Sequence, residues 1–515
     1  MKKYLIIIFA AAISALSITS CLVDEGNYDY KKLDEFYVDT VGKQVTFTVK
    51  QFSDLAVNSN LKYSGNKSDL TYKWSLYRAV SYTIGPSKYP LPEAHGYDKD
   101  DFQNFIIAET ENLSKNITAI PGAYTLQFEA TDSKTGITAM MRYSVTIEST
   151  ISTGLLVFYK GASKLDMDVI STPLLNANVT ETIHSKNVFS RANPSVTFPG
   201  DPRSCLFVSS GSLIYAATDQ DAKKLSRIDM SLASDFDGIF QEKPANKDFY
   251  MPRADMIIND GKYYKTTTWG LPIFVGPHEM KDNDTYDAAP FATLAYGANG
   301  VFYDQLKMRF LYAGMWDGFA QPVSALGTHF SFGNVGKKLI YGAAGYDAGL
   351  TYISFCVFKN PVDNGSRYLY AFRTHVSSHS GYLTQGAIDI SIAPQVANAD
   401  FWAFGERGPI VFYATKEKIY RLNYTLAGGA TGATEAWSFG SSEQITFMKL
   451  FKYNGIGLSA VAKDKYLMVG TFNSSTGVGK LYLLESDIAS GAISPTPAAV
   501  YTIAGKVGDV DFIAS

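Results

Sequence analysis

The sequence predicts an all-β protein in which a β-sandwich is followed by a β-propeller. Tyrosine and phenylalanine are abundant, with 34 and 32 residues, while long amphipathic helical patterns are missing. Short segments with alternating apolar and polar residues run through most of the chain. A chain of 515 residues is too long for one compact core, so at least two domains are expected.

The first 20 residues have the layout of a secretory signal peptide. Lys2 and Lys3 precede a nearly continuous apolar run over residues 4–18, which is too short to be read as a membrane span. The tetrapeptide ITSC that ends at Cys21 resembles the lipobox of bacterial lipoproteins. This resemblance implies that Cys21 is acylated and becomes the new N-terminus, and several acyl chains would anchor the protein firmly. An ordinary secretory signal is the alternative.

The residues after Cys21 resemble a sorting label. Asp24 and Glu25 are similar to the acidic surface-export signal of lipoproteins of the Bacteroidota. The resemblance implies a lipid-anchored protein of the outer membrane that faces the cell exterior, with a periplasmic orientation as the alternative. Residues 21–32 are expected to form a short tether.

Residues 33–149 are expected to form an Ig-like β-sandwich. The stretches KQVTFTVK and TYKWSLY alternate with a period of two, and the pair AYTLQFEATD and ITAMMRYSVTIES predicts a hairpin around SKTG. About seven short strands in such a length suit a sandwich of this kind. Trp74 lies in the middle of one predicted strand and is expected to be a core residue.

The sandwich region resembles the PKD-like module of Bacteroidota lipoproteins. The resemblance is carried by GNYDY after the lipobox, by LTYKWSLY, and by PGAYTLQFEATDSKTG over residues 121–136. The WDFGDG-type signature of true PKD domains is absent, because Trp74 is followed by Ser-Leu-Tyr. The resemblance therefore implies the fold, and it implies no function that depends on the signature.

Residues 150–515 are expected to form a β-propeller. Strand pairs recur at starts separated by roughly 45 to 58 residues, which is the length of a four-stranded blade with its loops. Seven such units fill the region, so we predict seven blades, with six or eight as alternatives. The recurring segments are 153–171, 206–230, 254–270, 299–316, 353–375, 400–425 and 458–487.

A short recurring tripeptide suggests how the ring closes. Ala254-Asp255-Met256, Ala399-Asp400-Phe401 and Val510-Asp511-Phe512 are each expected to open the first strand of a blade. The third copy lies at the C-terminus, while the first recurring segment has no such opening strand. We therefore predict that the C-terminal strand completes the first blade and leaves no unpaired sheet edge.

No motif specific for a reaction is found. The sequence contains no GxSxG, HExxH, CxxC or phosphate-binding glycine loop, and sialidase-type Asp boxes are also missing. A net charge of −3 argues against nucleic acid as a partner. Cys205 and Cys356 lie in apolar strand-like runs and are expected to be buried thiols, with one disulfide between them as the alternative.

The metal signals are weak. Asp282, Asp284 and Asp287 supply several oxygen ligands in one loop, as calcium prefers, but the EF-hand pattern is incomplete and a solvated turn is the favoured alternative. His375 and His379 are four residues apart without a predicted helix to align them, so an exposed loop is expected there. We expect no cofactor, with calcium at the aspartate loop as the one candidate.

Four tryptophans are the better functional lead. Trp316 and Trp269 lie in the loop-like stretches MWDGF and TTTWG, and Trp437 and Trp402 follow as weaker candidates. Exposed aromatic rings stack on sugar faces or hold peptide side chains. Packing between blades is the alternative for each ring.

The chain as a whole resembles the PKD-like family lipoproteins of Bacteroidota. This resemblance implies an accessory of an outer-membrane nutrient importer, with a SusC-like transporter and a SusD-like lipoprotein as partners and a glycan or oligopeptide as ligand. We expect a binding or scaffold protein rather than an enzyme. A propeller hydrolase or lyase for the same nutrient and a purely structural importer subunit are the alternatives.

Overall fold

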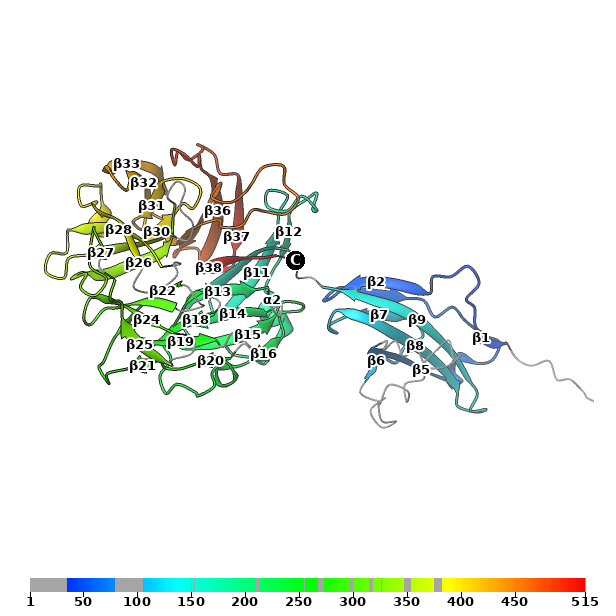
Figure 1. Cartoon of the computed structure of the whole chain (residues 1–515). Helices are drawn as coiled ribbons and strands as arrows, with labels where there is room; N and C mark the ends of the chain where they lie inside the picture. The colour runs from blue at the N-terminus through cyan, green and yellow to red at the C-terminus, as the bar shows by residue number, and fades with distance from the viewer. Residues whose placement is uncertain are drawn as a thin grey trace, which may run out of the picture. The chain divides into compact units, whose positions relative to one another are not determined.

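The computed structural model describes residues 35–78, 105–149, 151, 153–209, 213–253, 255–266, 273–295, 300–314, 318–325, 327–346, 353–374 and 382–514. The chain divides into two compact units. The first comprises 1–117 with 122–148, and the second comprises 149–515 with 118–121. Both units are built of strands with almost no helix (Figure 1). Within the described ranges, no helix is long and apolar enough to cross a membrane.

The first unit contains one large sheet and two strand pairs. The large sheet has the order β2-β9-β8-β5-β6, in which β2 runs parallel to β9 and the other pairs are antiparallel. The two pairs are β1-β4 and β3-β7. The strand bounds are β1 Phe36–Val38, β2 Thr46–Lys50, β3 Asp54–Val57, β4 Leu61–Tyr63, β5 Leu70–Arg78, β6 Ile106–Ala108, β7 Leu113–Asn116, β8 Gly122–Asp132 and β9 Thr138–Glu148, with a 3-10 turn at Lys67–Asp69.

The core of the first unit forms around Trp74, as the sequence predicts. Its side chain is fully buried, with ring centroids 4.6 Å from Phe128 and 5.9 Å from Tyr143. The indole Nε1 donates a hydrogen bond of 2.9 Å to the carbonyl oxygen of Thr110, so the buried polar atom is satisfied. The predicted hairpin is also confirmed, because β8 and β9 pair antiparallel over their whole length.

The described residues of the second unit form seven sheets of four or five strands. In the first sheet the order is β12 (Ile183–Ser185), β11 (Leu165–Ser171), β10 (Gly154–Gly161), β38 (Gly505–Ile513). The second is β13 (Pro202–Val208), β14 (Leu213–Thr218), β15 (Ala222–Ser226), β16 (Leu232–Ser234), and the third is β17 (Phe249–Arg253), β18 (Met256–Asn259), β19 (Lys262–Thr266), β20 (Phe274–Val275). The fourth is β21 (Glu279–Met280), β25 (Phe319–Pro322), β24 (Arg309–Ala313), β23 (Gly300–Asp304), β22 (Ala288–Leu294).

The remaining three sheets follow the chain order. They are β26 (Lys338–Ala344), β27 (Ile353–Lys359), β28 (Arg367–Arg373), β29 (Leu383–Asp389); β30 (Phe401–Phe404), β31 (Ile410–Ala414), β32 (Lys418–Thr425), β33 (Gly429–Ser438); and β34 (Gln444–Leu450), β35 (Tyr466–Asn473), β36 (Val478–Glu485), β37 (Ala499–Ile503). The helical segments of this unit are short: α2 (Val188–Ala192) and 3-10 turns at Phe236–Gly238 and Val396–Asn398.

The sheets are arranged like the blades of a propeller (Figure 1). One edge strand of each sheet belongs to the series β38, β13, β17, β22, β26, β30 and β34. Each member of this series contacts the next, and β34 contacts β38 again. These seven inner strands therefore surround one axis. Each of the seven segments that recur in the sequence falls in a different sheet.

The C-terminal strand completes the first sheet, as predicted. β38 pairs antiparallel with β10, from Gly154 opposite Ile513 to Gly161 opposite Gly505. The expectation for the tripeptides is only partly correct. Asp511 lies in the inner strand β38 and Asp400 directly precedes the inner strand β30, but Asp255 precedes β18, the second strand of its sheet. The inner strand there is β17, which is paired with β18 through a bulge.

Two carboxylates on β38 bind the free edge of the neighbouring sheet. Asp509 Oδ2 accepts a hydrogen bond of 2.8 Å from the backbone N–H of Cys205, and Asp511 Oδ2 accepts one of 2.6 Å from the N–H of Phe207. Because side chains two residues apart in a strand share a face, both carboxylates reach the same edge of β13. On the other side, Thr446 Oγ1 donates to the carbonyl oxygen of Val507 at 2.8 Å.

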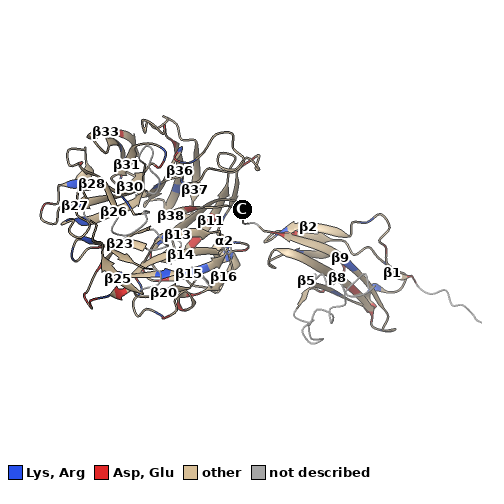
Figure 2. Cartoon of the chain, in the orientation of Figure 1, with Lys and Arg blue, Asp and Glu red and all other residues tan. Residues whose placement is uncertain are grey.

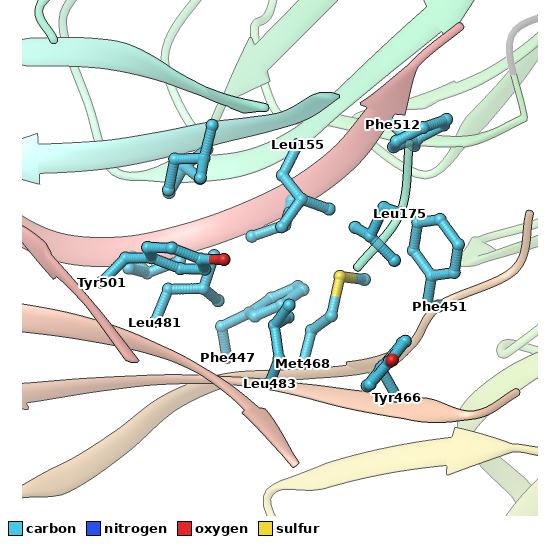
Figure 3. Close-up of a cluster of buried hydrophobic side chains, with 14 of the residues drawn as sticks. Leu155, Leu175, Phe447, Phe451, Tyr466, Met468, Leu481, Leu483, Tyr501 and Phe512 are labelled. Carbon is cyan, nitrogen blue, oxygen red and sulfur yellow. The ribbon is translucent and has the colours of Figure 1, made fainter. Parts of the chain in front are cut away.

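An apolar cluster joins the first and the last sheet. Figure 3 shows Leu155 and Phe512 of the first sheet beside Phe447, Met468 and other buried side chains of the last sheet. All of these residues are at most 9% exposed. The closing strand is therefore held by its hydrogen bonds to β10, by side-chain bonds to both neighbouring sheets, and by a shared core.

Candidate functional site in the axial cavity

The inner strands enclose a cavity of about 340 Å³, which we call the axial cavity. It is lined by residues of β13, β17, β22, β26 and β34 together with Gly508 and Asp509 of β38, so six of the seven sheets contribute to it. These strands are edges of their sheets, and they bring residues from positions 203 to 509 of the chain into one space. Figure 2 shows acidic and basic residues interspersed on the second unit rather than gathered by sign.

The polar centre of the axial cavity is the pair Lys449 and Asp509. The Lys449 Nζ lies 3.5 Å from Asp509 Oδ1 and 3.4 Å from the carbonyl oxygen of Val510. One third of the Lys449 side chain is exposed, whereas Asp509 is 10% exposed. The Nζ–Oδ1 distance is longer than the 2.7–2.9 Å typical of a charge-assisted hydrogen bond, and we therefore call this an open ion pair.

Burial and neighbouring charges both act on this pair. Burial lowers the pKa of Lys449, but the carboxylates of Asp509 and Asp511 outweigh it, so the pKa is raised and the ammonium stays charged at neutral pH. Burial raises the pKa of Asp509, and Lys449 together with the N–H of Cys205 acts in the opposite direction. The pKa values of both side chains are thus shifted by burial and by the charges around the cavity.

Aromatic side chains form much of the remaining wall. Tyr250, Tyr341, Phe291 and Phe447 all line the axial cavity. Burial raises the pKa of both tyrosines, and the charge of Asp509 raises it further, so both phenols keep their protons at neutral pH. Within the described part of the chain, neither phenol hydroxyl forms a hydrogen bond.

The other cations of the cavity wall already face carboxylates. Arg203 Nη1 is hydrogen-bonded to Asp248, and Arg253 Nε donates to Asp255 Oδ1 at 3.1 Å. Lys449 has Asp509 as its partner. Each positive charge of the wall is thus matched by a negative charge.

The described residues of the cavity wall include few acidic or nucleophilic side chains. Among its described residues there is one carboxylate, Asp509, and no histidine or cysteine. The Ser204 hydroxyl is buried and has no hydrogen-bond partner among the described residues. The arrangement suits binding through hydrogen bonds and aromatic contacts.

Several residues singled out in the sequence lie outside the described residues. These are the predicted lipidation site Cys21, the export-signal residues Asp24 and Glu25, the tryptophans Trp269 and Trp316, and the histidines His375 and His379. They remain predictions.

The two described tryptophan candidates are not brought together. Trp402 is 2% exposed on the inner strand β30 and packs against Tyr413 at 5.4 Å between ring centroids. Trp437 is half-buried on β33, the strand furthest from the axis in its sheet, and lies 6.3 Å from Phe439. Neither lines the axial cavity. Trp402 belongs to a buried apolar cluster, and Trp437 is partly buried against another.

The aspartate loop is engaged with cationic side chains. Asp284 is bonded to Lys307 and lies 3.1 Å from Arg309 Nη2, and these bonds lower its pKa to about 2. Burial raises the pKa of Asp287, as does the neighbouring charge of Asp304. Among the described residues, no group of three or more His, Cys, Asp or Glu side chains could hold a metal ion, and this includes Asp282, Asp284 and Asp287.

Cys205 and Cys356 are free buried thiols, so the disulfide alternative is wrong. They lie on strands of different sheets, β13 and β27. Burial raises the pKa of both thiols well above the ordinary value, which makes them unreactive.

The residues of the axial cavity carried no signal in the sequence. Tyr250, Tyr341, Lys449 and Asp509 lie far apart in the chain and belong to no motif. Only the assignment of the inner strand of each sheet could have pointed to them, because those strands alone reach the axis.

Among the comparisons with known proteins, the family match covers only the N-terminal part of the chain. A model of the PKD-like family matches residues 21–193, about a third of the chain. The matched range includes the described strands of the first unit and extends to α2 in the second unit. No curated protein matches the sequence.

Solved structures are similar only in fold. A quinonprotein alcohol dehydrogenase-like protein from Bacteroides thetaiotaomicron has 10% identity and a TM-score of 0.49, with 93% of this chain and 99% of that chain covered. Hsv2p of Kluyveromyces lactis has 9% identity and a TM-score of 0.35, with 67% and 98% covered. YCF48 from Cyanidioschyzon merolae has 10% identity and a TM-score of 0.34, with 61% and 92% covered. The N-terminal third of the chain is thus similar to the PKD-like family, and the remaining described residues form β-sheets with almost no helix.

Proposed function

We propose that the chain is a non-enzymatic binding protein that takes a small ligand in the axial cavity. The observation that carries this proposal is the open Lys449–Asp509 pair in a cavity whose wall also contains the phenols of Tyr250 and Tyr341. Binding sites for small molecules are concave, have mostly apolar and aromatic walls with a few polar groups, and measure about 300–1,000 Å³. The axial cavity lies at the small end of this size range, and its wall combines aromatic side chains with polar and charged groups.

The proposed architecture is an Ig-like sandwich followed in the chain by a seven-bladed propeller. The seven sheets and the closed series of inner strands support the blade number. The five-stranded sheet and the buried Trp74 support the sandwich. A ring whose inner strands are fixed on both sides gives a binding site that is formed before the ligand arrives, which lowers the entropic cost of binding.

The proposed location is the outer membrane, with Cys21 as the lipid anchor and the protein facing the cell exterior. The lipobox-like ITSC and the following Asp24-Glu25 support this location, and the family-model match begins at Cys21. The proposed partners are a SusC-like transporter and a SusD-like lipoprotein, for which the protein would capture a glycan or oligopeptide. Metabolic labelling with a fatty-acid probe should mark the wild type and leave Cys21→Ser unmarked, and labelling that persists in Cys21→Ser would contradict the anchor.

The binding site itself is tested by blocking the axial cavity. Ala344 lines the cavity and is exposed, so Ala344→Trp should fill the space without disturbing a packed core. Ligands found by screening glycans and oligopeptides should bind the wild type and fail to bind Ala344→Trp, while both proteins unfold at the same temperature. A ligand that binds both proteins equally well would place the binding site elsewhere.

A further inference from the structure

We infer that the axial cavity selects an uncharged, polyhydroxylated ligand of the size of a mono- or disaccharide. This inference rests on the proposed binding function and names the chemical class of its ligand. It follows from the charge balance, the open ion pair and the aromatic wall.

The charge balance of the cavity disfavours a charged ligand. Arg203, Arg253 and Lys449 each have a carboxylate partner, as described above. Lys265, which is 5% exposed, lies 4.0 Å from the same Asp255 that accepts from Arg253. Asp511 adds a second carboxylate near Lys449 and lies outside the cavity wall.

The charges of the four cations and the four carboxylates therefore sum to zero. The cations are Arg203, Arg253, Lys265 and Lys449, and the carboxylates are Asp248, Asp255, Asp509 and Asp511. A ligand carboxylate or ammonium would have to displace a partner that is already in place. Asp509 is only 10% exposed, so breaking its pair with Lys449 would leave an unpaired buried charge, which is costly.

The open ion pair matches a hydroxyl group. Asp509 Oδ2 is occupied by the N–H of Cys205, so Oδ1 is the oxygen that faces Lys449. A hydroxyl both donates and accepts hydrogen bonds. One ligand hydroxyl can therefore accept from the Lys449 ammonium and donate to Asp509 Oδ1 at the same time, which a carbonyl oxygen or an ammonium cannot do.

The aromatic wall supplies the complementary contacts. The phenols of Tyr250 and Tyr341 add two groups that both donate and accept, and they interact electrostatically with each other and with the ion pair. Phe291 and Phe447 add apolar surface to the same wall. Sugar rings present hydroxyls at their edges and C–H groups on their faces, so aromatic side chains and charged hydrogen-bonding groups together fit this class.

The inference is tested by isothermal titration calorimetry on the full chain with a panel of neutral sugars, uronic acids, free amino acids and dipeptides. We expect a neutral sugar to bind with an affinity that does not change between low and high sodium chloride, because no net charge is neutralised. Tyr250→Phe and Tyr341→Phe keep the rings and remove the hydroxyls, and each should weaken binding roughly 2- to 12-fold. Tyr368→Phe on β28, outside the cavity wall, is the matched control and should leave the affinity unchanged.

The outcomes separate the ligand class from the binding function. If uronic acids, amino acids or dipeptides bind more tightly than every neutral sugar and Ala344→Trp abolishes that binding, the ligand class is wrong and the cavity remains the binding site. Unchanged affinity in both Tyr→Phe variants would also contradict the ligand class. If no compound in the panel depends on Ala344, the proposed function itself fails.

Discussion

Replacing Phe512 by alanine tests how the ring of sheets is held closed. The Phe512 side chain is 2% exposed on the C-terminal strand β38 and contacts Phe451 and Tyr453, with ring centroids 5.1 and 5.3 Å away. Replacing a buried phenylalanine by alanine costs about 3–5 kcal/mol, because apolar contacts are lost and a cavity remains. We expect the free energy of unfolding of the second unit to fall by this amount.

The assay is urea unfolding followed by tryptophan fluorescence, with Trp402 and Trp437 as probes inside the second unit. The midpoint should fall without a change in the slope, because the same surface is exposed on unfolding. Lys506→Ala, an exposed position on the same strand, is the control and should change stability by less than about 0.5 kcal/mol. A Phe512→Ala protein as stable as Lys506→Ala would refute the closure by β38.

Three further predictions follow from burial and charge. Cys205 and Cys356 should resist a thiol-specific reagent in the native protein and react after unfolding in urea, since burial raises the pKa of both thiols. If the native protein were labelled as fast as the unfolded protein, the thiols would not be buried. The pKa of Asp284 falls from the ordinary 3.8 to about 2 on folding, so its contribution to stability is present above 3.8 and lost as the pH drops through 2. Stability should therefore decline less between about pH 5 and pH 2 in Asp284→Asn than in the wild type, and identical pH profiles would contradict the ion pairs. Trp74→Ala should destabilise the first unit by about 3–5 kcal/mol in pulse proteolysis, whereas an unchanged unfolding midpoint would mean that Trp74 is not central to this core.

The sheet architecture could be predicted because it depends on local patterns. A strand with alternating or continuously apolar residues is visible within five to ten positions, and the seven recurring segments coincide with strands of seven different sheets. The closure by β38 was predictable for a similar reason, because the C-terminal strand had no partner of its own in the sequence. The pairing of Leu155 with Phe512 bears this out.

The inner strands were harder to assign than the sheets. Asp255 and Asp400 precede similar apolar residues, yet Asp400 precedes an inner strand and Asp255 precedes a second strand. In the third sheet the inner strand β17 contains Pro252 and pairs through a bulge, which hides its alternation. Which strand of a sheet faces the axis depends on how the sheets pack around it, and the local sequence does not show this.

The axial cavity could not be predicted because its residues meet only after the ring forms. Lys449 and Asp509 are 60 residues apart, and Tyr250 and Tyr341 lie still further from them. None has a neighbouring residue that would mark it as functional. The sequence analysis ranked Trp316 and Trp269 first, and these lie outside the described residues. The weaker candidate Trp402 has its ring in the core, since an aromatic residue on an inner strand is as suited to packing as to binding.

Hydrogen exchange with and without a bound neutral sugar tests the central proposal most directly. Ligand in the axial cavity should slow exchange of backbone amides on the inner strands β17, β26, β34 and β38, whose edges surround it, and leave the outer strands β16, β29 and β37 unchanged. Slower exchange confined to outer strands or to the first unit would contradict the axial cavity as the binding site.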